Sequence, residues 1–113
     1  FQVINSLSGI RLPLQNEKET QIAIENIFIK NSIKYEREHR LDDKNIVDFF
    51  ILGKIAIEIK IKGNARKIYK QCERYCQFDS VSELVLITNR SMGFPEQINK
   101  KPCYFINIGK AWL

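Results

Sequence analysis

The chain has 113 residues, of which 44% are hydrophobic and 27% charged, a composition typical of one globular domain. This excludes collagenous and disordered proteins, and no apolar run approaches the roughly 20 residues that span a bilayer. Eighteen Lys and Arg against thirteen Asp and Glu give a net charge of +5, which suits a polyanionic partner but also many plain basic domains. Three cysteines, an odd number, exclude a disulfide framework and indicate reduced thiols in a cytoplasmic protein.

The first half of the chain predicts an irregular arm, a helix and a strand. Ser, Gly and Pro favour an irregular arm over residues 1–15. Asn16 is a suitable N-cap for a helix that starts at Glu17 and ends near Asn31, and apolar residues recur along it near a 3.6 period. Over Ile33–Leu41 the pattern changes to alternation, which predicts a first strand.

The second half predicts a hairpin, a helix and two further strands. Two β-rich runs, Ile46–Leu52 and Ile55–Ile61, are joined at Gly53-Lys54, a hairpin signal. The later elements are a helix capped by Asn64 that ends near Phe78-Asp79, an apolar strand over Leu84–Thr88 and a last strand over Tyr104–Ile108. This order predicts a single-domain α/β fold with its core over about residues 17–108, in which helices flank a mixed sheet with a central antiparallel meander.

Acidic and basic residues stand out in the predicted hairpin. The strand Ile55–Ile61 alternates strictly, so its isoleucines share the core face, and Glu58 and Lys60 lie side by side on the other face. Asp48 is the only charged residue in the preceding strand, where a charge is costly without a partner or a task. The simpler interpretation is that Glu58 and Lys60 belong to a solvated strand face.

The register of the hairpin decides whether the two carboxylates meet. A two-residue loop places Asp48 opposite Ile59, so that Asp48 and Glu58 lie on opposite faces. A three-residue loop, or a bulge at Gly53, places Asp48 opposite Glu58, with the side chains about 5 Å apart. Two like charges at that distance repel, so the pair requires a cation. A divalent metal ion would supply it, and Lys60 adds a further positive charge.

These residues resemble the signature of a nuclease superfamily. Asp48 followed by Ile57-Glu58-Ile59-Lys60 resembles the PD-(D/E)XK motif, with Val47 in place of the Pro. Gln71-Cys72-Glu73-Arg74-Tyr75 is similar to the Q-x-x-x-Y motif of its RecB-like and Cas4-like exonuclease branch. The resemblance implies a restriction-endonuclease-like fold with an αβββαβ core, which is the element order predicted above. Cas4-like members hold an iron–sulfur cluster on four cysteines, and three cysteines predict no such cluster here.

The resemblance also implies a Mg²⁺ (or Mn²⁺) site. Asp48, Glu58 and the backbone carbonyl of Ile59 would hold the ion, which prefers oxygen ligands. Lys60 would orient or help activate the attacking water and stabilise charge on the phosphate. The hydrolysis of a phosphodiester needs such an ion to neutralise the phosphate and to lower the pKa of the water.

Further residues complete the expected site. The first helix would add an acid, and family spacing favours Glu17, with Glu19 and Glu25 as alternatives. Gln71 and Tyr75, one helical turn apart, would bond to a catalytic carboxylate or to the DNA backbone, unless Tyr75 packs on the sheet and Gln71 lies at the surface. Five cations would contact phosphates: Lys62, Arg66, Lys67, Lys70 and Arg74.

The sequence therefore predicts a Mg²⁺-dependent DNA nuclease with structure-selective or weakly sequence-specific cleavage. Its small size fits a phage or mobile-element origin and action alone, as a homodimer or as a larger homo-oligomer, without membrane attachment. Two alternatives stay open: a non-catalytic nucleic-acid-binding or assembly module on the same fold, and a basic protein-interaction domain with an accidental motif. The intact set of Asp48, Glu58 and Lys60 favours the nuclease, because a binding-only relic need not keep all three.

Overall fold

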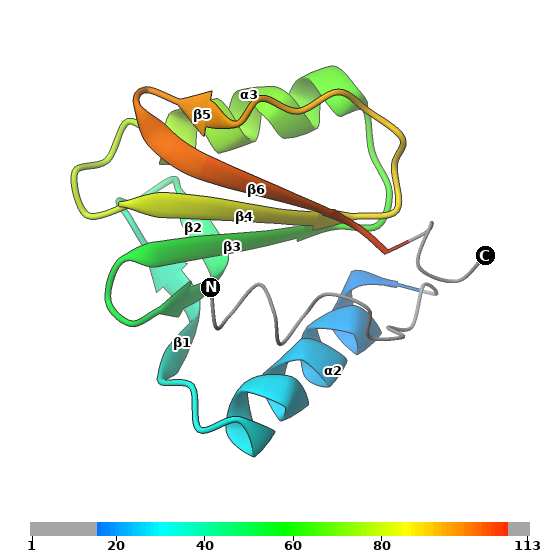
Figure 1. The fold of residues 1–113 in the computed structure, drawn as a ribbon, viewed down its shortest axis with the longest axis vertical. Coiled ribbons are helices and arrows are strands. Elements are labelled where there is room, and N and C mark those ends of the chain that lie inside the picture. Colours follow the sequence, from blue (N-terminus) through cyan, green and yellow to red (C-terminus); the bar gives the residue numbers. More distant parts are fainter. Residues whose placement is uncertain (1–15, 109–113) are drawn as a thin grey trace.

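The structure is a computed structural model that describes residues 16–108, and the predicted arm over residues 1–15 lies outside them. Figure 1 shows the described part as two helices and six strands. In chain order these are α2 (Glu17–Lys30), β1 (Tyr35–Arg40), β2 (Ile46–Ile51), β3 (Ile55–Lys60), α3 (Ala65–Tyr75), β4 (Glu83–Thr88), β5 (Gln97–Ile98) and β6 (Lys101–Asn107). Neither described helix has the length and apolar character needed to cross a membrane.

The six strands form one mixed sheet in the order β1-β2-β3-β4-β6-β5. As predicted, β1, β2 and β3 form an antiparallel meander, whereas β4 runs parallel to β3 and β6 runs parallel to β4. β5 is a short antiparallel partner of β6. α3 connects β3 to β4. Because these two strands are parallel, their carboxyl ends lie at the same end of the sheet. The predicted α/β class with a mixed sheet is confirmed.

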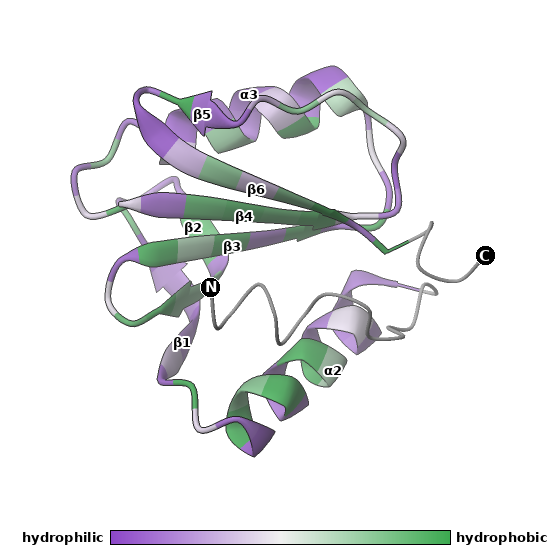
Figure 2. Ribbon diagram, viewed as in Figure 1, coloured by the Kyte–Doolittle hydropathy of each residue, from purple (hydrophilic) through white to green (hydrophobic). Residues whose placement is uncertain are grey.

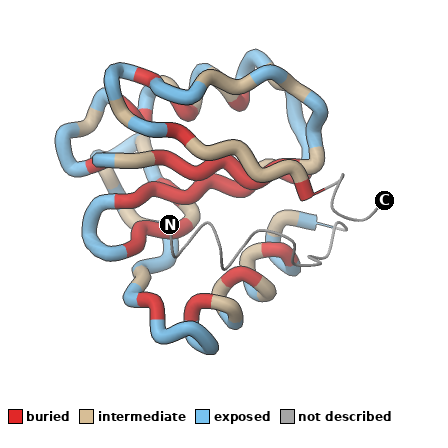
Figure 3. The backbone as a smooth tube through the Cα atoms, in the orientation of Figure 1, coloured by how far each residue is buried: buried red, intermediate tan, exposed pale blue. Residues whose placement is uncertain are grey.

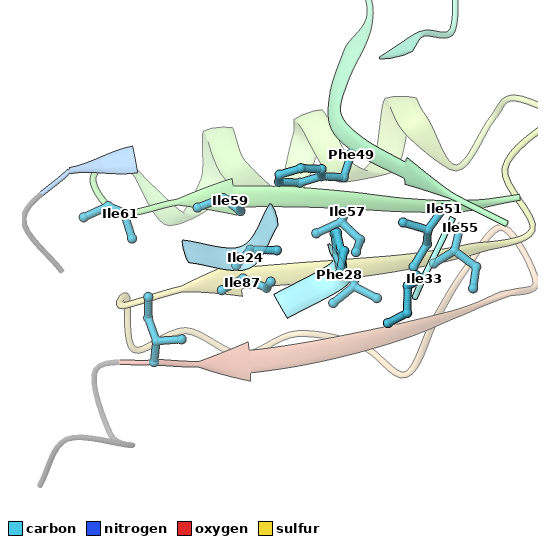
Figure 4. Close-up of a cluster of buried hydrophobic side chains, with 12 residues drawn as sticks. Ile24, Phe28, Ile33, Phe49, Ile51, Ile55, Ile57, Ile59, Ile61 and Ile87 are labelled. Atoms are coloured by element: carbon cyan, nitrogen blue, oxygen red, sulfur yellow. The ribbon is translucent and has the colours of Figure 1, made fainter. Parts of the chain in front are cut away.

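The two helices cover opposite faces of the sheet (Figure 1). On the α2 face, the isoleucines of β3 pack with Ile24 and Phe28 of α2 and with Phe49 of β2, as Figure 4 shows. The four isoleucines from Ile55 to Ile61 are at most 3% exposed, which confirms the predicted core row. Burial of this row against α2 fixes which face of β3 is left for Glu58.

The α3 face of the sheet has a core of its own. Ala56 of β3 and Leu86 of β4 pack there with Ile68 and Cys72 of α3. The central strands are therefore apolar on both faces and form the buried centre of the molecule, as Figures 2 and 3 show. The simpler interpretation of a solvated face is wrong, because α3 covers it and leaves Glu58 only 2% exposed.

The β2–β3 hairpin has the three-residue register. Ile51 pairs with Ile55, so the loop consists of Leu52–Lys54. Leu52 and Gly53 have φ values of 54° and 68°, in the left-handed region that glycine adopts without steric cost. This register places the side chains of Asp48 and Glu58 on the same side of the hairpin.

Three of the four helix ends lie within one residue of their predicted positions. Asn16 and Asn64 cap the two helices through their side-chain oxygens, and α2 ends at Lys30. α3 ends at Tyr75 rather than near Phe78-Asp79. The Gln77 and Phe78 amides bond to carbonyls only three residues back, so the chain tightens into a turn and leaves the helix early.

The C-terminal strands differ more from the prediction. β5 was not predicted, and β6 begins at Lys101 rather than Tyr104 and ends one residue before Ile108. Asn99 and Lys100 join β5 to β6 with φ values of 51° and 65°, a tight hairpin turn. A strand of two residues contains no alternation that a sequence pattern can reveal.

Candidate active site

The regular pairing of β2 and β3 ends where the two acidic residues face each other. Their ladder pairs end at Phe49 and Ile57, and the same register brings Asp48 opposite Glu58. From there each carboxylate accepts a hydrogen bond from the facing strand. The Asp48 amide donates to Glu58 Oε1 (3.3 Å), and the Ile59 amide donates to Asp48 Oδ2 (2.7 Å). The two carboxylates thus take the place of ladder carbonyls and lie together between the strands.

β1 is also irregular beside Asp48. Its pairing with β2 is interrupted between Arg37 and His39, at Glu38, whose φ of 50° lies in the left-handed region. This conformation is unfavourable for a residue with a side chain, and strain of this kind concentrates at functional sites. After the kink, the His39 ring stacks on Phe50 with the ring centroids 4.2 Å apart. Asp48 therefore lies where both neighbouring ladders are broken.

Burial and repulsion act on the two acids. Burial, and next the charge of Asp48, raise the pKa of Glu58 from 4.5 to about 8. Burial also raises the pKa of Asp48, against the opposing effects of the Ile59 amide and Lys60. Two carboxylates that face each other across neighbouring strands, one of them buried, do not both ionise at low cost without a cation. At neutral pH the pair therefore holds either a proton or a cation.

Lys60 is the cation that the described residues supply. Its Nζ lies 3.2 Å from Glu58 Oε2, and its side chain is 23% exposed. Burial lowers the pKa of Lys60, but the charges of Glu58, Glu17 and Asp48 outweigh this effect and raise it overall. Lys60 is therefore an ammonium ion at neutral pH. It suits the orientation of a water or a phosphate oxygen rather than the acceptance of a proton.

Gln71 and Tyr75 connect α3 to the acidic pair. Gln71 Nε2 donates to Tyr75 Oη (2.6 Å), and this hydroxyl lies 2.9 Å from the Ile46 carbonyl oxygen and 3.4 Å from Glu58 Oε2. Burial, and next the charge of Glu58, raise the pKa of Tyr75, so the phenol is a neutral donor. Tyr75 is 1% exposed. Tyr75 therefore packs on the sheet and also contacts the Glu58 carboxylate, so both of its expected contacts occur.

Glu17 is the acid of α2 that contacts the site strand. Its Oε1 accepts a hydrogen bond from the Ile61 amide (3.3 Å), and its charge contributes to the raised pKa of Asp48. Glu25 instead accepts hydrogen bonds from two side chains of β1, and Glu19 is exposed near the start of α2. The geometry therefore favours Glu17 over the other two candidates.

The donor set fits a hard divalent cation. Mg²⁺ takes oxygen ligands, and one or two protein carboxylates together with water and substrate phosphates complete its shell. Asp48 and Glu58 supply two carboxylates, and the Ile59 side chain is buried in the core, so only its backbone is available. Within residues 16–108 no group of three or more His, Cys, Asp or Glu side chains is placed to hold a metal ion. The candidate site therefore depends on two carboxylates.

A basic groove runs along α3 next to the acidic pair. Its volume is about 680 Å³, and it is lined by Asn64, Arg66, Lys67, Lys70, Gln71 and Arg74. Gln71 connects the groove to Glu58 through Tyr75. Four of the five predicted phosphate contacts thus share one surface. The fifth, Lys62, lies in a separate hollow of about 150 Å³ that Glu17 also lines.

Two cations occupy an unfavourable position in α3. Arg66 and Lys67 lie in its first turn, which contains no acidic residue. The N-terminus of a helix carries a partial positive charge, so cations are unfavourable there and anions are favourable. The arrangement reduces the stability of the free protein and suits an anionic ligand such as phosphate.

Sequence reasoning missed the residues at the C-terminal end of β4. Lys60 pairs with Thr88, the last residue of β4, so Asn89 and Arg90 follow directly beside the site. The sequence does contain a signal for them, because the apolar strand Leu84–Thr88 is followed directly by the polar residues Asn89 and Arg90. The carboxyl ends of parallel strands are where α/β sheets bind ligands.

Comparison with known proteins returns no match: no protein family, curated protein or solved structure resembles this chain significantly. The geometry and electrostatics of the site are the observations from which its function is inferred.

Proposed function

We propose that the protein is a Mg²⁺-dependent nuclease of the PD-(D/E)XK type, which hydrolyses DNA phosphodiester bonds on a restriction-endonuclease-like αβββαβ core. The observation that supports this most strongly is the pair of half-buried Asp48 and buried Glu58 across β2 and β3, with Lys60 3.2 Å from Glu58. The raised pKa values of both acids mean that the pair is unfavourable when ionised and free of metal. A divalent cation removes this cost.

Each residue has a distinct task in this proposal. Bound Mg²⁺ (or Mn²⁺) supplies a Lewis acid that neutralises the phosphate and lowers the pKa of a water. Asp48, Glu58 and the Ile59 carbonyl would hold it. Lys60, an ammonium ion, orients a water or a phosphate oxygen and stabilises the charge that grows on the phosphate in the transition state. Tyr75 is a positioning residue that restrains the Glu58 carboxylate.

The groove on α3 supports DNA as the substrate. Its Arg and Lys side chains suit backbone phosphates, and phosphate contacts position a nucleic acid without reading its sequence. Weakly sequence-specific or structure-selective cleavage therefore follows from this groove. Because Gln71 and Tyr75 join the groove to Glu58, a bound strand would pass the acidic pair. The proposal places the protein in the cytoplasm, as a monomer or a homo-oligomer.

The test is incubation of the protein with supercoiled plasmid, linear duplex, branched DNA and RNA, each in Mg²⁺, Mn²⁺ or EDTA. We expect cleavage of at least one DNA substrate with either metal ion and none in EDTA. Asp48→Asn, purified identically, controls for contaminating nucleases. Absence of cleavage by the folded protein in both metal ions would overturn the proposal.

A non-catalytic nucleic-acid-binding module on the same fold is the second candidate. The specific observation in its favour is that the four cations of the α3 groove need no metal ion to bind phosphates. A gel-shift assay with the same substrates distinguishes the two candidates. Salt-sensitive binding without cleavage under any metal condition would select the binding module.

A further inference from the structure

The end of β4 lies next to Lys60 and takes no part in the proposed metal site. Lys60 pairs with Thr88, after which Asn89 and the exposed Arg90 follow. In the sheet order, β2 with Asp48 and β4 with Thr88 flank β3 on opposite sides. Arg90 therefore lies across β3 from the acidic residue of β2, at the edge where parallel strands of α/β sheets bind ligands.

Hydrogen bonds hold the backbone of this turn in place. The Arg90 amide donates to Thr88 Oγ1 (3.1 Å), and the Asn107 side-chain amide donates to the Arg90 carbonyl oxygen (3.2 Å). The Ile108 amide donates to the Thr88 carbonyl oxygen (2.9 Å). Within residues 16–108, no carboxylate lies within ion-pair distance of the Arg90 guanidinium. The turn thus has an anchored backbone, and among the described residues its exposed guanidinium has no carboxylate partner, two residues beyond the Thr88 that pairs with Lys60.

Asn89 has a second unusual feature. Among the described residues, its Oδ1 is the one buried side-chain polar atom that lacks a hydrogen-bond partner. Buried amide groups in folded proteins are nearly always paired, with protein, water or ligand. An unpaired amide oxygen next to an exposed arginine whose backbone is held in place is unusual for an ordinary surface turn and suits a ligand site with ordered water.

We propose that Asn89 and Arg90 form a second phosphate subsite, which binds a backbone phosphate of DNA adjacent to the phosphate at Lys60. This inference rests on the proposed nuclease function. The guanidinium binds the phosphate oxygens through charge-assisted hydrogen bonds, and the Asn89 amide accepts from a water that the phosphate also holds. With the α3 groove on the β2 side and Arg90 on the β4 side, the protein would grip the strand on both sides of the cleaved bond.

The experiment compares Arg90→Gln, which removes the charge, with Arg90→Lys, which keeps it. Lys100→Gln is a matched control, because Lys100 is exposed in the turn at the opposite end of β6 from Asn107. The measurement is fluorescence anisotropy of a short labelled DNA duplex in Ca²⁺, over a series of KCl concentrations. We expect Arg90→Gln to weaken binding about 3- to 10-fold and to reduce the slope of log K against log salt by about 1.

Arg90→Lys should retain the wild-type salt slope, and Lys100→Gln should bind as the wild type does. Wild-type affinity and salt slope in Arg90→Gln would overturn the subsite and leave the nuclease proposal standing, since that proposal depends on cleavage. An equal loss in Lys100→Gln would also overturn it, because the effect would then reflect net charge alone. If the wild type does not bind the duplex, the subsite is overturned, while the cleavage assay still decides the nuclease proposal.

Discussion

The Asp48 amide donates a hydrogen bond to Glu58 Oε1 at 3.3 Å, while the charge of Asp48 contributes to a Glu58 pKa of about 8. The backbone of one acid therefore stabilises the carboxylate of the other, although the two side chains repel each other when both are ionised. Because these bonds replace part of the β2–β3 ladder, the site is assembled by the fold itself. A preformed site of this kind binds its ion without first having to order its ligands.

The metal-free protein should lose stability as the pH rises from about 5 to 8. The pKa of Glu58 is about 8 in the folded protein against an ordinary value of 4.5, so in this interval the folded state binds the extra proton. Each pH unit then lowers the free energy of unfolding by up to about 1.4 kcal/mol from this group. Thermal melts in EDTA over this range measure the effect. Glu58→Gln should flatten the profile, and an identical profile in that variant would contradict the prediction.

Lys60→Ala should keep the fold and lower the single-turnover cleavage rate by about 10²–10³-fold. The side chain points away from the isoleucine row, so its removal opens no cavity in the α2-face core. The melting temperature and DNA affinity in Ca²⁺ should stay near those of the wild type. Lys62→Ala is the neighbouring control and should change affinity rather than rate. Unchanged cleavage by Lys60→Ala would refute the role assigned to this lysine.

Simultaneous Arg66→Gln and Lys67→Gln should raise the melting temperature and weaken DNA binding. Each cation in the first turn of α3 opposes the helix dipole by about 0.3–1 kcal/mol, which the substitutions relieve. Differential scanning calorimetry and anisotropy on the same samples give both quantities. Lys70→Gln, farther along the groove, should weaken binding without raising the melting temperature. A lower melting temperature in the double variant would contradict this prediction.

Sequence periodicity was sufficient to predict a helix or strand that buries one of its faces. The alternation of Ile55–Ile61 and the caps Asn16 and Asn64 predicted β3 and both helix starts, because burial and capping act locally. The register of the β2–β3 hairpin could not be predicted in this way. Two- and three-residue loops at Gly53 bury the same isoleucines, so local pattern left the pairing of Asp48 open until the strands were placed.

The rest of the candidate site depends on contacts between distant segments. The choice among Glu17, Glu19 and Glu25 follows from how α2 crosses the end of β3, which no local pattern reveals. Arg90 becomes relevant only because β4 lies parallel to β3 and ends beside Lys60. Residues of this kind are separated widely in sequence and meet through the topology of the sheet.

Tyr75→Phe should destabilise the protein by about 1–2 kcal/mol and lower the cleavage rate. The substitution leaves the Ile46 carbonyl and the Gln71 amide without their shared partner at a position that is 1% exposed. Urea denaturation of Tyr75→Phe, Glu58→Gln and the double variant forms a double-mutant cycle. We expect a coupling above about 0.5 kcal/mol between the two residues. Additive effects would mean that the contact between Tyr75 and Glu58 does not restrain the carboxylate.

The central claim, a metal-dependent nuclease site at Asp48, is tested most directly by single-turnover cleavage of supercoiled plasmid in Mg²⁺ by the wild type and Asp48→Asn. The amide retains an oxygen that can accept from the Ile59 amide, so the fold should persist, but it is a poor ligand for a hard cation. Asp79→Asn, at an exposed carboxylate, is the matched control. We predict cleavage by the wild type and the control, and a rate for Asp48→Asn reduced to that of the wild type in EDTA. Cleavage by Asp48→Asn at the wild-type rate would contradict the claim.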